Sequence, residues 1–305
     1  MQPPMIVLVG PTATGKSALA IECCHRMARD GGVGEIVNGD SMLVYRGMDI
    51  GTAKPAPEER GGIVHHLVDV MDVTETASVA WFQRRAREVI EGIRARGAVP
   101  VLVGGSALYT RAITDHFDFP GSDPELRARL EGELERLGAA ALHRRLSEVA
   151  PASAAWIEPG NGRRIVRALE VHELTGGHQA VLPEWTYELD GVHQFGLTLE
   201  RTELDRRIDA RVDAMFEAGL VAEVHSLLDR GLAEGRTASM AIGYRQVIEH
   251  LHGLRTEAEA RDEVKRATRR FFRKQLGWYR RDPRITWLTA GDPDNVERIL
   301  RAVGL

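Results

Sequence analysis

Cysteine is nearly absent from this chain: among its 305 residues, only Cys23 and Cys24 are cysteines, and they are adjacent. Neighbouring cysteines cannot form an ordinary structural disulfide, which excludes a disulfide scaffold and fits a reducing compartment. A long apolar run is also absent, and no basic leader precedes the first short apolar run at residues 5–9. We therefore expect a cytoplasmic protein without a signal peptide or a membrane contact.

An excess of positive charge is absent as well, because 40 basic and 44 acidic residues give a formal charge of −4. The whole chain thus differs from a typical nucleic-acid binder. Between Arg261 and Arg284, however, ten Lys or Arg residues stand against three Asp or Glu, and such a segment could follow a phosphate backbone. The 11 histidines have no spacing typical of a zinc site, so we expect no zinc.

Short runs rich in Val, Ile and Leu alternate with longer segments of helical period, the pattern of a parallel sheet covered by helices. Residues 78–97 predict one such helix, because their apolar side chains recur on one face before Gly97. We predict strands at residues 5–10, 34–40, 65–71, 99–105 and 193–199, and residues 285–288 could add an edge strand. The expected fold class is α/β.

The strand pattern stops after residue 119 and returns only at residue 193. Asp123 and Pro124 predict an N-cap and a first helical turn, and further helical segments follow. We therefore predict an inserted all-helical domain at residues 120–186. It would separate the first part of the core, residues 1–119, from its second part, residues 187–305, which is helical after its strand.

The stretch "GPTATGKS", residues 10–17, matches the phosphate-binding pattern G-x-x-x-x-G-K-[ST] in full, between a predicted strand and a predicted helix. In such a loop the backbone N–H groups surround a diphosphate, and the helix N-terminus adds partial positive charge. Lys16 would neutralise phosphate oxygens, and the Ser17 hydroxyl would bind Mg²⁺. The motif predicts a bound diphosphate or triphosphate, but it leaves open whether ATP supplies it.

Motor ATPases and GTPases usually carry a second acidic residue beyond a strand tip. None is clear here, since the strand at 99–105 ends in two glycines and Asp69 lies inside the predicted strand at 65–71. A group-transfer enzyme is the better interpretation. Asp40, at the end of the second strand, could take a proton from an acceptor at the ligand-binding edge of the sheet. A turn or N-cap role for Asp40 is equally compatible with its position.

Three other segments carry candidate contacts, each with an ordinary structural alternative. "GGSALY", residues 104–109, could let a substrate approach the backbone or could form a plain tight turn. Arg163, Arg164 and Arg167 could clamp phosphate or form a solvated basic face. Arg211 follows the fifth strand on a helix, where surface ion pairs are the default.

The segment around residues 257–281 predicts a long helix with one packed face and one basic face. The basic face could hold nucleic-acid phosphates, although solvated arginines are common on the helices of unrelated proteins. The side chains expected to pack are Val264, Thr268, Phe271 and Trp278, and the basic ones opposite are Arg266, Arg270, Arg273 and Arg280.

Seven segments together resemble the tRNA dimethylallyltransferase family over nearly the whole chain. In family order they are "GPTATGKS" (10–17), "GDSMLVYRGMDIGTAKP" (39–55), "GGSALY" (104–109), "RRIVRALEVHELTG" (163–176), "RVDAMFEAGLVAEV" (211–224), "AIGYRQ" (241–246) and "RKQLGWYR" (273–280). The resemblance implies transfer of the dimethylallyl group of dimethylallyl diphosphate to the exocyclic amine of the adenosine 3′ of the anticodon in tRNA, with release of diphosphate. The loop would then hold that diphosphate and not ATP.

The family also implies a P-loop kinase-like core, an inserted helical domain that binds tRNA and moves, and Mg²⁺ as the cofactor. The partners would be dimethylallyl diphosphate and the anticodon stem-loop of tRNA, and we expect a monomer. The implied catalytic residues are Asp40 as general base, with Ser17 and Arg211 at the diphosphate; Ser17 would also hold the metal. The implied diphosphate-binding residues are Gly10, Pro11, Thr12, Ala13, Thr14, Gly15, Lys16 and Ser17.

The resemblance carries over a set of tRNA-contacting positions from three parts of the chain. They are Asp40, Ser41, Met42, Leu43, Ser106, Arg127, Arg163, Arg164, Ile165, Val166, Arg167, Met240, Ala241, Ile242, Gly243, Tyr244 and Arg245. Two of them depart from the family pattern. Ser106 stands where the family has Thr, and Met240 stands where it has an arginine, so this chain lacks the family's charged side chain at position 240.

Two other functions are compatible with parts of the pattern. A small-molecule or nucleotide kinase with a lid would also have a phosphate loop, an insertion and clamping arginines, and consumption of ATP would distinguish it. An RNA-binding module without activity would require a degenerate loop. The loop is complete, which disfavours that alternative.

Overall fold

The computed structural model describes residues 2–177 and 184–305. The chain divides into a core unit, Met1–Asp115 with Tyr187–Leu305, and a helical unit, His116–Thr186. No helix in the described part of the chain is long and apolar enough to cross a lipid bilayer.

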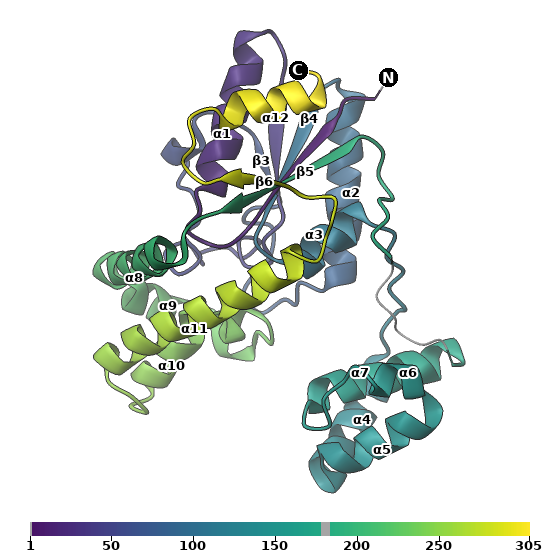
Figure 1. Ribbon diagram of the computed structural model, residues 1–305. Coiled ribbons are helices and arrows are strands. Elements are labelled where there is room, and N and C mark those ends of the chain that lie inside the picture. Colours follow the sequence, from purple (N-terminus) through teal and green to yellow (C-terminus); the bar gives the residue numbers. More distant parts are fainter. Residues whose placement is uncertain (1, 178–183) are drawn as a thin grey trace. The chain divides into compact units, whose positions relative to one another are not determined.

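A six-stranded sheet forms the centre of the core unit, with the strand order β3-β2-β4-β1-β5-β6 (Figure 1). All of its neighbouring strands run parallel. The residues of β1, β2 and β4 are buried throughout, as expected for strands covered on both faces. The strands are β1 (Met5–Val9), β2 (Gly34–Asn38), β3 (His65–His66), β4 (Val99–Gly104), β5 (Val192–Thr198) and β6 (Thr286–Thr289). The predicted α/β class with a parallel sheet is confirmed.

Strand β3 is shorter than predicted, so the placement of Asp69 inside a strand was wrong. Leu67 and Asp69 have φ angles of 61° and 56°, and this left-handed backbone ends the extended run. Asp69 therefore lies beyond the strand end. Its carboxylate pairs with Lys54 Nζ at 2.5 Å and with Arg60 Nη2 at 3.7 Å. Two cations of the protein neutralise it.

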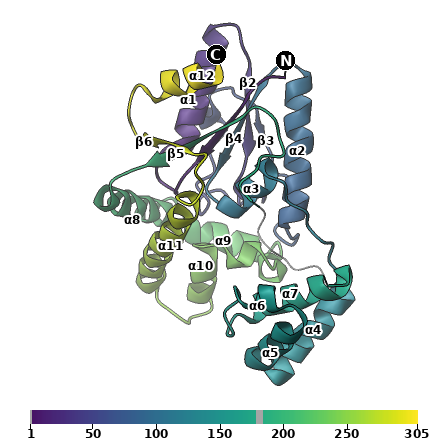
Figure 2. The ribbon, with the colours of Figure 1, turned by 45° about the vertical axis from the view of Figure 1, so that its right-hand side comes forward.

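Helices cover both faces of the sheet (Figure 2). Alternate residues of β1 point to opposite sides: Met5, Val7 and Val9 pack in the cluster with α2 (Val79–Ala95), and Ile6 and Leu8 pack in the cluster with α1 (Lys16–Arg29) and α12 (Asn295–Val303). The stripe predicted for residues 78–97 is confirmed, since Phe82, Ala86, Ile90 and Ile93 are buried on α2. The other helices of the core unit are α3 (Ala107–Thr114), α8 (Arg201–Glu217), α9 (Leu220–Leu228), α10 (Tyr244–Leu251) and α11 (Glu257–Tyr279).

The long helix α11 has a packed face and a charged face, but the predicted packed face was partly wrong. Phe271 is 44% exposed, whereas its neighbour Phe272 is buried. The two side chains differ by about 100° around the helix, so only one of them can face the core. Part of the basic face is paired within the protein, because Arg266 and Arg270 both bond to Glu263. Among the described residues, no ion pair is seen for Arg273, Lys274, Arg280 and Arg281.

The helical unit has a hydrophobic core of its own, in which Leu130, Leu142 and Leu169 are buried. Its helices are α4 (Pro124–Leu137), α5 (Ala139–Val149), α6 (Pro151–Ala154) and α7 (Gly162–Thr175). The predicted cap of α4 is confirmed, because the Asp123 carboxylate accepts the N–H groups of Glu125 and Leu126 at 2.9 and 3.1 Å.

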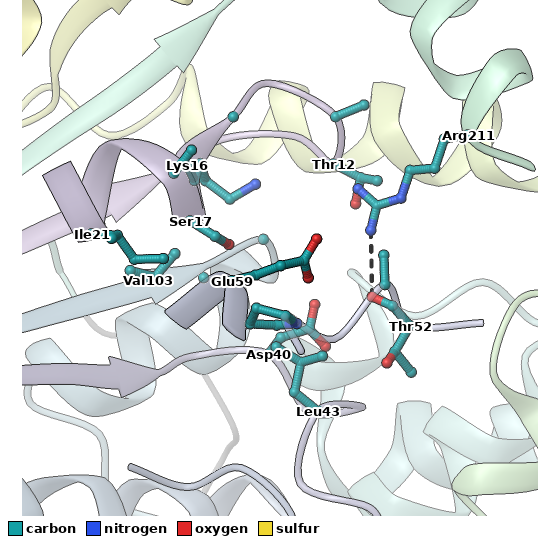
Figure 3. A pocket seen from close by; sticks show the side chains of 17 residues that line it. Thr12, Lys16, Ser17, Ile21, Asp40, Leu43, Thr52, Glu59, Val103 and Arg211 are labelled. Atoms are coloured by element: carbon teal, nitrogen blue, oxygen red, sulfur yellow. Dashed lines mark hydrogen bonds between the residues drawn. The ribbon is translucent and has the colours of Figure 1, made fainter. Parts of the chain in front are cut away.

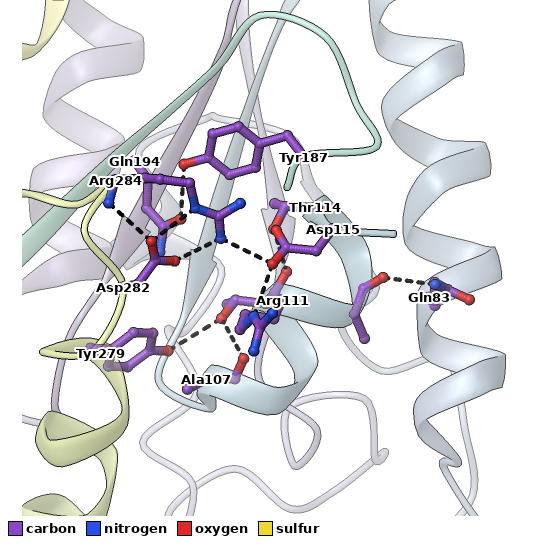
Figure 4. Close-up of polar contacts among 12 residues, drawn as sticks. Gln83, Ala107, Arg111, Thr114, Asp115, Tyr187, Gln194, Tyr279, Asp282 and Arg284 are labelled. Atoms are coloured by element: carbon purple, nitrogen blue, oxygen red, sulfur yellow. Dashed lines mark hydrogen bonds and ion pairs between the residues drawn. The ribbon is translucent and has the colours of Figure 1, made fainter. Parts of the chain in front are cut away.

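A buried polar network joins the two points at which the chain leaves and re-enters the core unit (Figure 4). Asp115, fully buried after α3, accepts bonds from Arg111 Nε and Arg284 Nη2, both at 2.9 Å. Arg284 also pairs with Asp282 at 2.7 Å and lies 3.9 Å from the centre of the Tyr187 ring. Because unpaired buried charges are costly, these partners hold Asp115 and Tyr187, which form a β-bridge, in one arrangement.

Candidate active site

The loop of residues 10–17 connects β1 to α1 in the conformation that its glycines allow. Gly10 has a φ angle of 134°, and a Cβ there would lie 2.7 Å from the Leu197 carbonyl oxygen. Gly15, with a φ angle of 86°, is the N-cap of α1. Lys16 folds back over the loop, where its Nζ donates to the Pro11 carbonyl at 2.6 Å. The loop therefore presents the N-terminus of α1 at the carboxyl end of β1.

A pocket of about 330 Å³ opens beside this loop, within the core unit (Figure 3). The side chains of Lys16, Ser17, Asp40 and Arg211 point into it from α1, the loop after β2, and α8. The structure thus brings the three candidate catalytic residues together with the phosphate loop. The lining residues are Thr12, Ala13, Gly15, Lys16, Ser17, Ala18, Ile21, Asp40, Leu43, Thr52, Ala53, Pro55, Glu59, Val103, Gly104, Gly105 and Arg211.

Two cations in the pocket lack an anionic partner at bonding distance among the described residues. Burial lowers the pKa of Lys16 to about 8; the charge of Asp40 acts against this, and that of Arg211 adds to it. Burial also lowers the pKa of Arg211, again opposed by Asp40. Arg211 donates to the Thr52 carbonyl at 3.4 Å, and its buried Nε has no partner. Two half-buried cations in one pocket without a paired anion are the arrangement expected of an anion site.

Asp40 is half-buried, and its backbone is fixed by its neighbours. Its N–H donates to Asn38 Oδ1 at 2.8 Å, and Asn38 Nδ2 donates to the Asp40 carbonyl at the same distance. Its carboxylate oxygen Oδ1 accepts the Met42 N–H at 2.9 Å. In the described part of the chain, the other oxygen, Oδ2, has no hydrogen bond. Asp40 is therefore a turn residue and a pocket carboxylate at once, so the two alternatives left by the sequence do not exclude each other.

Residues 52–59 form a part of the pocket wall that was not predicted from the sequence. Thr52, Ala53 and Pro55 line the pocket, and the Glu59 carboxylate also points into it (Figure 3). One signal was present: the stretch "GMDIGTAKP", residues 47–55, belongs to the segment that leaves the second strand at the ligand-binding edge of the sheet.

The positions of the core unit that are predicted to contact tRNA differ in exposure. Met240, at 57%, and Arg245 are exposed, and Ser106 is half-buried as the N-cap residue of α3. The side chains of Ala241 and Tyr244 are buried. A nucleic acid at residues 240–245 would therefore meet the two exposed side chains and not Tyr244.

The predicted tRNA-contacting residues of the helical unit also include both exposed and buried side chains. Arg163 and Arg164 are exposed at the start of α7, and neither has an ion pair in the described residues. Ile165 and Val166 belong to the hydrophobic core of the unit. The remaining candidates, Arg127 and Arg167, pair with the buried Glu170 at 2.6 and 2.8 Å, which lowers the pKa of that carboxylate against the effect of its burial.

The parallel sheet and the glycine-rich loop before α1 place the chain among α/β proteins with a P-loop-like core. The IPP transferase family model matches residues 43–282. The tRNA dimethylallyltransferases of Kineococcus radiotolerans and Thermobifida fusca are 57% and 55% identical, each over 98% of this chain and 95% and 94% of their own length. The chain therefore belongs to the tRNA dimethylallyltransferase family, as its motifs predicted, and is an enzyme.

Solved structures agree with this assignment. A tRNA isopentenylpyrophosphate transferase from Bacillus halodurans is 40% identical with a TM-score of 0.70, covering 99% of this chain and 95% of the other. A eukaryotic dimethylallyltransferase acting on tRNA is 26% identical with a TM-score of 0.78, covering 99% of this chain and 78% of the other. These similarities do not favour the kinase alternative.

Proposed function

We propose that the pocket binds the diphosphate of dimethylallyl diphosphate and that the chain transfers the dimethylallyl group to the exocyclic amine of the adenosine 3′ of the anticodon in tRNA. One observation carries the proposal: Lys16 and Arg211 converge without a bonded anion, and the Asp40 carboxylate faces the same space (Figure 3). The diphosphate would supply the missing negative charge. Asp40 would stand beside the attacking nitrogen.

The chemistry requires a charged site of this kind. The adenine amine is a poor nucleophile because its lone pair is delocalised into the ring, so the allylic carbon must be strongly activated. As the bond from that carbon to the diphosphate oxygen breaks, negative charge gathers on the leaving diphosphate. Lys16, Arg211 and the loop N–H groups stabilise that charge. The new carbon–nitrogen bond forms, and Asp40 accepts the proton that nitrogen loses.

The residues present fit the expected Mg²⁺. The described residues contain no group of three or more His, Cys, Asp or Glu side chains that could hold a metal. Mg²⁺ prefers a few protein oxygens together with substrate phosphates and water, and the Ser17 hydroxyl in the pocket is such an oxygen. When bound, the ion would neutralise part of the charge of the diphosphate.

The tRNA would contact exposed basic residues of both units. Arg163 and Arg164 are candidates in the helical unit, and Arg245, Arg273 and Arg280 are candidates in the core unit. The target adenine must leave its stack to reach the pocket, and these contacts would offset the unstacking energy.

We also propose that the protein acts as a monomer in the cytoplasm. The pocket is formed within one chain. Cys23 and Cys24 are both free and buried, and burial raises their thiol pKa values to about 12, so they are unreactive.

Transfer without ATP is the test of the proposed function. Purified protein is incubated with tRNA and labelled dimethylallyl diphosphate, with and without ATP, and both the modified nucleoside and free diphosphate are quantified. We expect one diphosphate released per modified adenosine, with no effect of ATP. Modification or phosphoryl transfer that depends on ATP would refute the proposal in favour of a kinase.

Donor affinity is expected to fall at high pH because Lys16 loses its proton. The pKa of Lys16 is about 8 in the free protein, and a bound diphosphate favours the charged form and raises that pKa. Below pH 8 the ammonium is charged in both the free and the donor-bound protein, so donor affinity changes little. Above pH 8 the free protein must take up a proton when the donor binds, and donor affinity should fall by up to about tenfold per pH unit. Calorimetric titration with dimethylallyl diphosphate from about pH 7 to pH 9.5 measures this.

A Lys16→Met variant serves as the control for the pH experiment. It should bind the donor weakly and without the decline above pH 8. Equal affinity of the unsubstituted protein across the whole range would show that Lys16 does not carry the diphosphate charge.

Replacing Arg163 and Arg164 together with Ala should weaken tRNA binding and reduce its salt dependence. Each lost phosphate contact makes the negative slope of log affinity against log salt shallower by about 0.7 to 0.9, so the loss of two contacts makes it shallower by about 1.4 to 1.8. Filter binding across a salt series measures the slope. The matched control is Arg129→Ala with Arg145→Ala, which removes the same charge from arginines already paired with Glu133 and Glu173. Equal slopes for both double variants would contradict a tRNA role for Arg163 and Arg164.

A further inference from the structure

The Glu223 carboxylate on α9 is surrounded by donors from two other parts of the core unit. Its Oε2 accepts the backbone N–H groups of Asp49 and Ile50 at 3.1 and 2.7 Å. Its Oε1 accepts the Gly51 N–H at 3.2 Å and the Tyr244 hydroxyl at 2.6 Å. Three successive backbone N–H groups thus converge on one carboxylate. Such an arrangement is an anion-binding turn that the protein fills with a side chain of its own.

The turn held by Glu223 continues directly into the pocket wall. Thr52 and Ala53 follow it and line the pocket, and Ala53 has a left-handed φ angle of 49°. The Thr52 carbonyl accepts the bond from Arg211, 3.4 Å away. Glu223 therefore fixes the backbone segment whose Thr52 carbonyl bonds to Arg211, the arginine expected to contact the diphosphate. Without the carboxylate, three N–H groups would lose their acceptor, and this stretch would rearrange.

Tyr244 connects the same turn to a segment assigned to tRNA. Its side chain is fully buried, and a Cβ on Gly51 would lie 2.5 Å from its ring, so the ring packs directly against the turn. Tyr244 follows residues 240–243, of which Met240 is exposed, and precedes the exposed Arg245. The buried side chain thus faces the donor pocket wall while its neighbours face solvent.

We propose that Glu223 and Tyr244 are positioning residues for the transfer reaction. They hold residues 49–53 in the conformation that completes the donor pocket. They also link this conformation to the position of residues 240–245, the segment predicted to contact tRNA. The inference rests on the proposed function, because it assumes that the pocket binds the allylic diphosphate. It assigns a role to Tyr244 that differs from a direct tRNA contact.

Glu223→Gln tests the inference with little change in shape. The carboxamide has one acceptor oxygen in place of two and turns an N–H₂ donor toward a backbone N–H, so the turn loses its anion. We expect the donor KM and the dissociation constant for inorganic diphosphate to rise by about tenfold. At saturating donor, kcat should change less than about threefold, and tRNA affinity should stay within about twofold.

Tyr244→Phe and Tyr45→Phe form a matched pair. Both tyrosines are fully buried, but the Tyr45 hydroxyl bonds to Glu75 and Ala77 and not to the turn. Tyr244→Phe should raise the donor KM by about threefold, and Tyr45→Phe should leave it unchanged even if it lowers the melting temperature. If Glu223→Gln does not fold, this pair decides the question.

Three results would overturn the inference: a folded Glu223→Gln variant with unchanged diphosphate affinity, no rise in KM for Tyr244→Phe, or equal rises for both tyrosine variants. Failure of the unsubstituted protein to bind diphosphate or to use the donor would instead refute the proposed function. The two failures are therefore distinguishable.

Discussion

Asp40→Asn should lower kcat by about 10² to 10⁴-fold, the range for the loss of a general base. The amide oxygen can still accept the Met42 N–H, as Oδ1 does at 2.9 Å, so the turn after β2 should keep its shape. The amide cannot take the proton from the adenine nitrogen. Single-turnover transfer with saturating tRNA and donor measures the chemical step. Binding of both substrates should change by less than about threefold, because the loss is confined to the transition state.

The control for Asp40 is Asp72→Asn, which removes an exposed carboxylate of the same unit that pairs with Arg46 and Arg230. It should leave the transfer rate within about twofold, as expected of a surface ion pair. An Asp40→Asn variant as fast as Asp72→Asn would show that another group accepts the proton. The exposed Glu59 carboxylate, which also lines the pocket, would then be the next candidate for the proton acceptor.

Lys16→Met should lower kcat/KM by about 10² to 10³-fold, the range for losing a preorganised donor at a developing anion. The ammonium lies in the pocket and has no anion bonded to it, so its charge is available to the diphosphate. Steady-state kinetics with varied donor measures the loss, which should appear in both KM and kcat because the charge acts on the bound and the departing diphosphate.

Arg26→Met is the matched control on the same helix, since Arg26 pairs with Glu297 on the surface at 2.8 Å. It should change kcat/KM by less than about twofold. A Lys16→Met variant with near-normal kcat/KM would remove the phosphate loop from the reaction, and the diphosphate would have to bind elsewhere.

The parts of the structure that the sequence predicts are those set by local pattern. The apolar runs at 5–10 and 99–105 became β1 and β4 because their residues are apolar at every position, as strands buried on both faces require. The loop of residues 10–17 could be placed because glycine is needed at Gly10 and Gly15, where the backbone has positive φ angles. The family's motifs added the identity of the substrate, which geometry alone does not give.

The parts that escaped prediction depend on contacts between distant segments. Nothing local distinguishes Phe271 from Phe272; the core of the unit decides which one is buried. The Glu223 carboxylate meets residues 49–51 across more than 170 positions of sequence. A glutamate on a helix with ordinary period carries no sign of such a partner.

The most direct test of the account is a structure of the protein with tRNA and an unreactive analogue of the allylic diphosphate. We predict the two phosphoryl groups in the loop of residues 10–17, in contact with Lys16 and Arg211, and the adenine amine within about 3 Å of the Asp40 carboxylate. A diphosphate bound away from Lys16, or an Asp40 side chain turned away from the adenine, would contradict the account.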